Sequence, residues 1–278
     1  MIGDQHLSID KSIVGEVAYK GAKLVYESQG CGLPAILFVH GWTCNRSFFA
    51  PQMQYFAKRH RVISVDLRGH GKSDILEGAY FIESYADDLA SVLNHLDIQT
   101  VVAVGHSMGG FIALQLATTN PALVSALVLI DPTPFFMSSI LRILARGFNV
   151  GIRRGHKYIR KQLLKSMFRE KSSMELVRKI TGETLSVPDF VAAEAMRSIL
   201  NFDAQEVVRA CPSIPVLHVA PQKGPQNAAD KMSQLFPQVL NRSIMDCGHF
   251  AHLEAPEQVN HTIQTFLDDL PVASEPQG

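Results

Sequence analysis

The apolar residues of this chain fall into short runs that are separated by polar, glycine-containing turns. Nearly continuous apolar runs of about five to seven residues are typical of parallel strands buried on both faces. Such runs occupy 34–40, 61–66, 101–105, 126–130 and 214–220, with a weaker one near 241–245. The segment 11–30 alternates only weakly between apolar and polar positions, and it predicts an antiparallel strand pair at the sheet edge.

Apolar residues at helical spacing lie between these runs. They predict helices within 47–58, 84–96 and 256–270, and a further helix that begins near residue 108. Regular alternation of strand and helix is typical of an α/β domain with a doubly wound, mostly parallel sheet. Functional groups in such a sheet gather at the carboxyl ends of the strands.

The pattern changes between residues 134 and 203, where apolar residues recur at helical spacing and no strand-like run occurs. We interpret 134–203 as a helical cap, 1–133 with 204–272 as the core that carries it, and 273–278 as a disordered tail. The cap is visibly basic at Arg153, Arg154, Lys157, Arg160, Lys161, Lys165 and Arg169. We interpret these charges as a solvated surface rather than as a means of attracting an anionic substrate.

Composition narrows the classes of partner. Lys plus Arg and Asp plus Glu each number 26, so no overall charge favours nucleic acid or an acidic membrane surface, and a small molecule fits better. Residues 100–130 contain no charged side chain, but a turn at 105–110 and Asn120-Pro121 interrupt them, which indicates buried strands and a helix rather than a membrane span.

The first residues of the chain and the spacing of its cysteines predict the location of the protein and the state of its thiols. The first residues, MIGDQHLSID, lack the pattern of a secretory signal, so a cytoplasmic location is expected. Cys31, Cys44, Cys211 and Cys247 are scattered and are expected to be reduced thiols rather than disulfides or metal ligands.

A sharp break interrupts the apolar segment 101–114 at Gly105-His106-Ser107-Met108-Gly109. A G-x-S-x-G sequence between a strand and a helix is typical of the nucleophile elbow, a strained turn that exposes the serine hydroxyl above the sheet. Serine is a weak nucleophile, so this interpretation also requires a base, an acid that orients the base, and donors for an oxyanion.

A second glycine-containing loop follows the strand at 61–66. The sequence from Asp66 to Asp74 superficially resembles a phosphate-binding loop, but it lacks the G-x-x-x-x-G-K-[ST] spacing. We predict a hydrogen-bonded structural turn in which Arg68 and Asp74 support the scaffold. Dinucleotide motifs and metal-ligand spacings are also missing from the sequence, so no cofactor or metal is expected.

His40-Gly41-Trp42, the elbow, Asp131 and Gly248-His249 occur in this order along the chain. In this combination the sequence resembles the α/β-hydrolase superfamily over residues 20–270. The resemblance implies that Ser107 is the nucleophile, His249 the general base and Asp131 the acid. It also implies that the backbone amides of Trp42 and Met108 form the oxyanion hole.

The acid is the residue for which the sequence leaves an alternative. Most members of the superfamily place it after the strand that corresponds to 215–220, where this chain has Pro221-Gln222-Lys223-Gly224-Pro225 and no carboxylate. Asp131 matches a position used in some branches, and Asp230 is the alternative. His252 competes with His249 but lacks a preceding glycine, whereas His70 and His106 are expected to be packing residues.

The resemblance implies acyl transfer to water, since a serine at the elbow differs from the aspartate of dehalogenases and epoxide hydrolases. Carboxylic esters or lactones with a small to medium hydrophobic acyl group are the expected substrates, N-acyl homoserine lactones among them. Aromatic and methionine side chains are candidates for the lining of the acyl pocket, and packing between the cap and the core is the alternative for each: Trp42, Phe135, Phe136, Met137 and Phe148.

Two further functions remain open from sequence. Cofactor-free dioxygenases of quinolone-like compounds share this fold and use a His/Asp dyad, and Asp131 and the strand end near His218 resemble that branch. A receptor that binds a ligand with little turnover is the other alternative. The sequence gives no indication of the oligomeric state.

Overall fold

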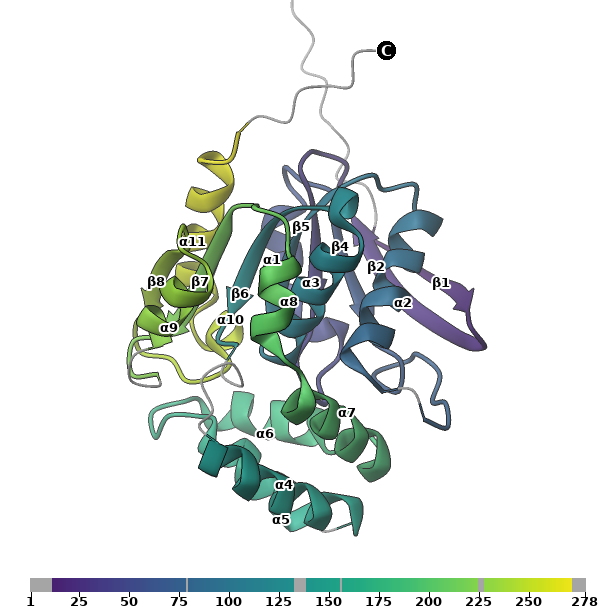
Figure 1. Cartoon of the computed structure of the whole chain (residues 1–278), viewed down its shortest axis with the longest axis vertical. Helices are drawn as coiled ribbons and strands as arrows, with labels where there is room; N and C mark the ends of the chain where they lie inside the picture. Colours follow the sequence, from purple (N-terminus) through teal and green to yellow (C-terminus); the bar gives the residue numbers. More distant parts are fainter. Residues whose placement is uncertain (1–11, 79, 133–138, 156, 225–227, 272–278) are drawn as a thin grey trace, which may run out of the picture.

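The computed structural model describes residues 12–78, 80–132, 139–155, 157–224 and 228–271. Within these ranges the chain forms one eight-stranded sheet with the order β1-β2-β4-β3-β5-β6-β7-β8 (Figure 1). β2 pairs antiparallel with β1 and β4, and the other pairings are parallel. The strands are β1 (Ile13–Tyr19), β2 (Ala22–Gln29), β3 (Ala35–Val39), β4 (Val62–Asp66), β5 (Val101–His106), β6 (Val124–Ile130), β7 (Val216–Pro221) and β8 (Leu240–Ile244).

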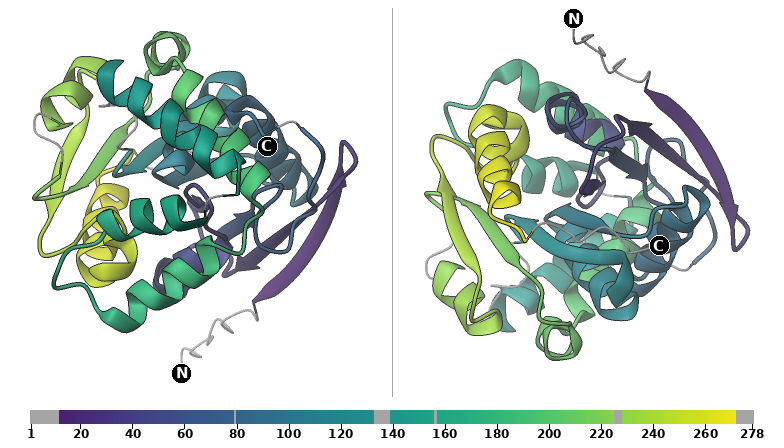
Figure 2. Two further views of the ribbon diagram at one scale, coloured as in Figure 1. Left: turned by 90° about the horizontal axis from the view of Figure 1, so that it is seen from below. Right: turned by 90° about the horizontal axis from the view of Figure 1, so that it is seen from above.

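Helices cover both faces of the sheet, which is why its central strands are apolar throughout (Figure 2). Successive side chains of β3 point to opposite faces. Leu37 and Val39 pack with α2 and α3, whereas Ile36 and Phe38 pack with α1 and α11. The helices are α1 (Ala50–Phe56), α2 (Ile82–His95), α3 (Met108–Thr119), α4 (Ser139–Arg153), α5 (Lys157–Ser166), α6 (Met174–Thr184), α7 (Asp189–Asn201), α8 (Ala204–Ala210), α9 (Ala228–Leu235), α10 (Ala251–Glu254) and α11 (Pro256–Asp268). The predicted doubly wound α/β fold is therefore confirmed.

Between β6 and α8 the described residues form the helices α4 to α7, which gather beyond one end of the strands (Figure 1). The indole Nε1–H of Trp42, after β3, donates to the carbonyl of Ala192 in α7 at 2.8 Å. We refer to α4 to α7 as the cap, and the division of the chain into a core and a cap at 134–203 stays a prediction.

Arg160, one of the basic residues of the cap, differs from the prediction that these charges are solvated. Arg160 is fully buried, and its guanidinium donates to the Val187 carbonyl at 2.9 Å, to the Asp189 carboxylate at 2.7 Å and to the Thr184 carbonyl. It joins α5 to the end of α6 and the start of α7. The interpretation as a solvated surface is therefore wrong for Arg160, while Lys161 and the other basic residues of α5 are exposed.

The charge-free stretch 100–130 forms β5, α3 and β6 together with the short 3₁₀ turn Pro121–Leu123, as predicted. Across the part of the chain that the structure describes, none of the helices combines the length and the apolar character needed to cross a membrane.

Candidate active site

Ser107 lies in the turn between β5 and α3, with φ 52° and ψ −116°, a conformation that L-residues rarely adopt. A Cβ atom at Gly105 would lie 2.2 Å from the Gly109 carbonyl oxygen, and one at Gly109 would lie 2.1 Å from the Val39 carbonyl oxygen. The two glycines therefore allow β5, α3 and β3 to approach closely enough for the turn to form. The Ser107 N–H donates to the carbonyl of Ile130 at 2.9 Å, which fixes the turn against β6. The strand–turn–helix predicted at this position is present.

Asp131 directly follows β6, with its N–H donating to the Val219 carbonyl at 2.7 Å. Its carboxylate Oδ2 lies 2.7 Å from Nδ1 of His249, and both side chains are nearly buried. The alternative acid, Asp230, is exposed in the first turn of α9. The structure thus brings Asp131, rather than Asp230, to His249.

Both main-chain groups of His249 are also bonded. Its N–H donates to the Met167 carbonyl at 2.8 Å, and its carbonyl accepts a hydrogen bond from Nε2 of His106 at 2.9 Å. A Cβ atom on the preceding Gly248 would lie 2.6 Å from that same Met167 oxygen, which explains why glycine is needed there. The segment after α5 and the elbow histidine therefore fix the backbone of His249.

The two amides expected to form an oxyanion hole come from segments that follow two neighbouring strands, β3 and β5. Met108 is the first residue of α3, and the first amides of a helix have no partner within the helix. Trp42 lies in the turn after β3, the strand that pairs with β5, and its indole is fixed by α7. Both residues are therefore placed at the carboxyl edge of the sheet, beside the elbow.

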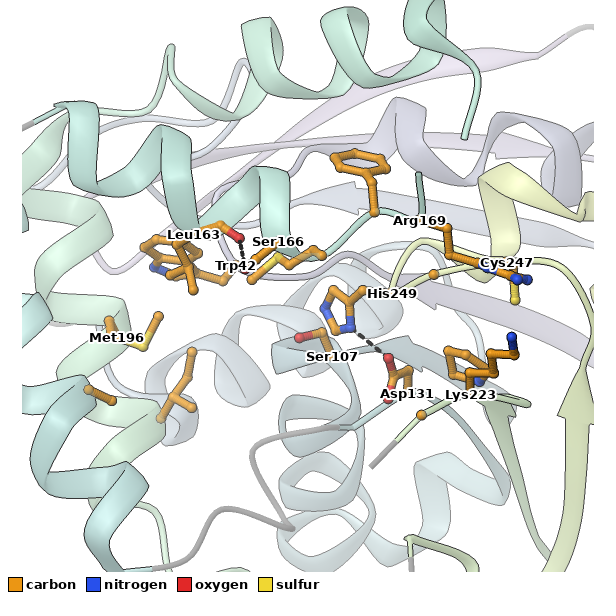
Figure 3. Close-up of a pocket in the computed structure, with 17 residues that line it drawn as sticks. Trp42, Ser107, Asp131, Leu163, Ser166, Arg169, Met196, Lys223, Cys247 and His249 are labelled. Atoms are coloured by element: carbon orange, nitrogen blue, oxygen red, sulfur yellow. Dashed lines mark hydrogen bonds and ion pairs between the residues drawn. The ribbon is translucent and has the colours of Figure 1, made fainter. Parts of the chain in front are cut away.

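A cavity of about 520 Å³ opens between the core and the helices α4, α5 and α7. Figure 3 shows Ser107, Asp131 and His249 at its centre. Trp42 lines it as predicted, but Phe135, Phe136 and Met137 lie outside the described residues. Phe148 is 54% exposed, so its predicted place in the pocket is wrong. The cavity is instead lined on its cap side by residues that the sequence did not single out, which are Ala145, Leu163, Met167, Met196 and Ile199.

The other histidines near the elbow are buried packing residues, as predicted for His70 and His106. His252 is stacked on Phe49 with ring centroids 4.8 Å apart, and burial lowers its pKa to about 3. Burial likewise lowers the pKa of His70 to about 3 and holds that of His106 well below its usual value. A buried neutral ring inside the core is a poor base for a group in the cavity, so His252 does not compete with His249.

The loop after β4 is a structural turn, as its spacing predicted. The Asp66 carboxylate accepts the backbone N–H of Arg46 at 2.8 Å and that of Lys72 at 3.0 Å. Arg68 forms a buried ion pair with Asp88, with Nε 2.6 Å from Oδ2. Asp74 accepts the N–H of Lys23 at 2.9 Å. Asp66, Arg68 and Asp74 therefore hold the loop in place through hydrogen bonds and an ion pair within the protein.

The four cysteines are free thiols, as expected. Burial raises the pKa of Cys44 and raises that of Cys247, at the cavity wall, to about 12. A thiol with a raised pKa is a poor nucleophile at neutral pH. Among the residues that the structure describes, no group of three or more His, Cys, Asp or Glu side chains is arranged to hold a metal ion.

The fold and this site together define an α/β protein with a serine at a strained turn beside a histidine–carboxylate pair. Residues 34–256 match the model of the alpha/beta hydrolase fold family, and the chain belongs to this family.

Three proteins of known sequence or structure show what this chain is similar to. A 2-(acetamidomethylene)succinate hydrolase of Mesorhizobium japonicum is 39% identical over 118 residues, which span 42% of this chain and 42% of that protein. A thermophilic esterase from Thermogutta terrifontis has 28% identity and a TM-score of 0.80, covering 93% of this chain and 98% of its own. An N-acyl homoserine lactone degrading enzyme has 25% identity and a TM-score of 0.79, covering 91% and 100%. The match to the succinate hydrolase spans less than half of that protein, whereas the two structural matches span nearly the whole of this chain.

Proposed function

We propose that this protein is a serine hydrolase that cleaves carboxylic esters or lactones through an acyl-enzyme. The observation that carries the proposal is the meeting of Ser107, His249 and Asp131 at one cavity, with His249 Nδ1 2.7 Å from Asp131 Oδ2. A serine, a histidine and a carboxylate at one cavity are the groups that activated-serine chemistry requires.

In the proposed reaction, Ser107 Oγ attacks the carbonyl carbon while Nε2 of His249 takes the hydroxyl proton. Asp131 accepts the Nδ1–H of His249, which selects the tautomer with a free Nε2 and stabilises the imidazolium. The tetrahedral intermediate collapses, the C–O bond to the leaving group breaks, and His249 returns the proton to the leaving alcohol. Water, deprotonated by His249, then attacks the acyl-enzyme. The second tetrahedral intermediate collapses, the C–O bond to Ser107 breaks, and His249 returns the proton to Ser107 Oγ as the acid is released.

The amides of Trp42 and Met108 are the proposed donors to the oxyanion that forms in both steps. The amide of Met108 acts with the positive end of the α3 dipole, which favours negative charge at this position. Removal of one such donor typically costs about 10² to 10³ in kcat.

The cavity supports a small to medium acyl group, since about 520 Å³ is within the range of about 300 to 1,000 Å³ common for small-molecule sites. Its cap side is apolar at Leu163, Met196 and Ile199. The esterase and the N-acyl homoserine lactone degrading enzyme among the similar structures favour esters and lactones as the first classes to test.

The test is covalent labelling by a fluorophosphonate, mapped by peptide mass, with hydrolysis of p-nitrophenyl acetate and butyrate measured alongside. We expect one adduct on Ser107, and loss of about 10⁴-fold or more in kcat in Ser107→Ala. Ser125→Ala, at an exposed serine of β6, is the matched control. A dyad dioxygenase would instead keep its turnover in Ser107→Ala, and a receptor would bind ligand with negligible ester cleavage. Either result would refute the proposed hydrolase.

A further inference from the structure

The cavity wall carries two basic side chains, Arg169 and Lys223, that the proposed reaction does not use. In Figure 3 both lie on the side where Cys247 is found, whereas Leu163 and Met196 lie on the opposite side of Ser107 and His249. A mostly apolar cavity that contains a few placed charges uses them to orient a ligand.

The fold explains why these two residues share one side. Lys223 follows β7, and the adjacent Gln222 N–H donates to the Ile244 carbonyl of β8 at 2.9 Å. Arg169 comes from the cap, but its Nη1 lies 3.0 Å from Oδ1 of Asp246, two residues after β8. Both basic groups are therefore at the β7/β8 end of the cavity.

The opposite end is formed by the cap helices. Leu163 belongs to α5, and Met196 and Ile199 belong to α7. Trp42 is tied to this end because its indole donates to the Ala192 carbonyl of α7. Ser107 thus lies between an apolar end and a basic end of a single cavity.

The two positive charges are available to a ligand. Lys223 is exposed and makes no ion pair with any of the described residues. Arg169 has one carboxylate partner, Asp246, whose side chain is 83% exposed. Solvent screens such a pair, which contributes little to stability, and a guanidinium has further N–H donors to offer.

We propose that Arg169 and Lys223 form a subsite for a carboxylate group of the substrate, with the apolar part of the substrate in the end lined by Leu163 and Met196. This inference rests on the proposed function, because it places the ester or lactone carbonyl at Ser107 between the two ends. A carboxylate matches the planar fork of an arginine, and the lysine adds a second positive charge. The preferred substrate is therefore an ester or lactone that bears a carboxylate on one side of the scissile bond.

The test uses two pairs of esters. One pair is mono-p-nitrophenyl glutarate and p-nitrophenyl valerate, which differ by a carboxylate on the acyl side. The other is 4-carboxyphenyl butyrate and phenyl butyrate, which differ by a carboxylate on the leaving group. The measured quantity is the ratio of kcat/KM for the charged ester to that for the neutral ester, and differences in intrinsic reactivity cancel when variants are compared.

In Lys223→Gln and in Arg169→Gln we expect this ratio to fall about tenfold for one of the two pairs, the effect of removing one charge-assisted hydrogen bond at a partly exposed site. Damage to the fold lowers both rates and leaves the ratio unchanged. Lys165→Gln is the matched control, because it removes a positive charge from an exposed position of α5 outside the cavity wall. An unchanged ratio in both variants, or an equal fall in Lys165→Gln, would overturn the subsite.

A variant with the opposite effect gives an independent check. Asp246→Asn removes the carboxylate that competes for Arg169, and asparagine tolerates the positive φ of 54° at this position. We expect the ratio to rise about two- to fivefold, which corresponds to the usual strength of an exposed ion pair. A ratio that stays constant or falls in Asp246→Asn contradicts the proposal.

Direct binding separates this inference from the proposed function. If no ester is cleaved and Ser107 is not labelled, the hydrolase proposal fails, and calorimetry with hexanoate still examines the subsite. Weaker hexanoate binding in Lys223→Gln than in Lys165→Gln supports a carboxylate subsite. Equal binding by the two variants, or no binding by the wild-type protein, refutes it.

Discussion

Acid is expected to unfold this protein in a pH range where most proteins are still stable, because several histidines are buried as neutral rings. Burial lowers the pKa of His40 to about 4 and that of His70 and His252 to about 3, from the usual value of about 6.5 for histidine. Each of these rings is at most 1% exposed. The perturbation is a fall in pH from 7 to 5 without any change of sequence.

The sign follows from which state binds more protons. Between the lowered pKa values of the folded state and 6.5, the unfolded chain binds a proton at each of these histidines and the folded protein does not. Stability is therefore fully present above about pH 6.5 and is lost as the pH falls toward 4. Most carboxylates titrate below pH 5, so the window from 7 to 5 reports mainly on histidines.

The magnitude can be worked out for each ring. A histidine with a pKa of 6.5 when unfolded and of 3 to 4 when folded costs about 2 kcal/mol in the free energy of unfolding between pH 7 and 5. Three such rings cost about 6 kcal/mol, compared with a total of about 5 to 15 kcal/mol for a typical domain. Near pH 5.5 each ring contributes a slope of about 1.2 kcal/mol per pH unit.

The assay is urea unfolding followed by circular dichroism at pH 7, 6 and 5. His252→Phe removes one buried titrating ring and keeps the stack on Phe49, so the slope should fall by about 1.2 kcal/mol per pH unit. His261→Gln, at an exposed position of α11, should leave it unchanged. A free energy of unfolding at pH 5 within about 1 kcal/mol of its value at pH 7 would refute the reasoning, as would an unaltered slope in His252→Phe.

Three other predictions follow from close contacts in the core and at the site. Gly109→Ala places a Cβ 2.1 Å from a backbone oxygen of β3, so it should abolish ester hydrolysis and lower the melting temperature. In the control Gly182→Ala, in α6, the added Cβ meets no heavy atom within 4 Å. This control should leave hydrolysis and melting temperature intact or raise stability by up to about 1 kcal/mol. Arg68→Met leaves the Asp88 carboxylate buried without its partner and should lower the free energy of unfolding in urea by about 3 to 5 kcal/mol. The double variant with Asp88→Leu should recover most of that loss. His106→Phe removes the hydrogen bond to the carbonyl of His249, the proposed base, and should lower kcat for ester hydrolysis about tenfold. His106→Gln keeps a hydrogen-bond donor and should recover part of that rate in the same assay.

The sequence predicted the central strands because their burial on two faces leaves a nearly continuous apolar run. The strand β8 gave only a weak signal, since it lies at the sheet edge and most of its side chains are not buried. Helices α8, α9 and α10 were not predicted, because they are at most eight residues long and too short to show a helical period. Local pattern therefore identifies the interior of the sheet better than its margins.

At the site, the elbow was predictable because Gly105, Ser107 and Gly109 fall within five consecutive residues, so the motif can be recognised without knowing which strands lie beside it. The acid was not decided by sequence, since the distance from His249 to Asp131 or to Asp230 depends on how β6 and α9 are placed in space. The lining of the cavity was harder still, because α4, α5 and α7 carry apolar residues both toward the core and toward solvent, as exposed Phe148 shows. From sequence, Arg169 is interpreted as part of a solvated surface and Lys223 is not singled out, because the two residues come from segments that only the fold brings together at the cavity.

The cap contributes to the site in two ways through the same short segment. Met167 lines the cavity with its side chain and accepts the His249 N–H with its carbonyl. Nearby, Ser172 accepts the N–H of Arg169 and donates to Glu254, which in turn accepts the N–H of Gly248 at 3.0 Å. A change in the path of this segment therefore moves the wall that contacts the substrate and the backbone of the proposed base together. We therefore expect that a change in the backbone path of this segment alters both the cavity lining and the position of His249, whereas a side-chain substitution there alters the lining alone.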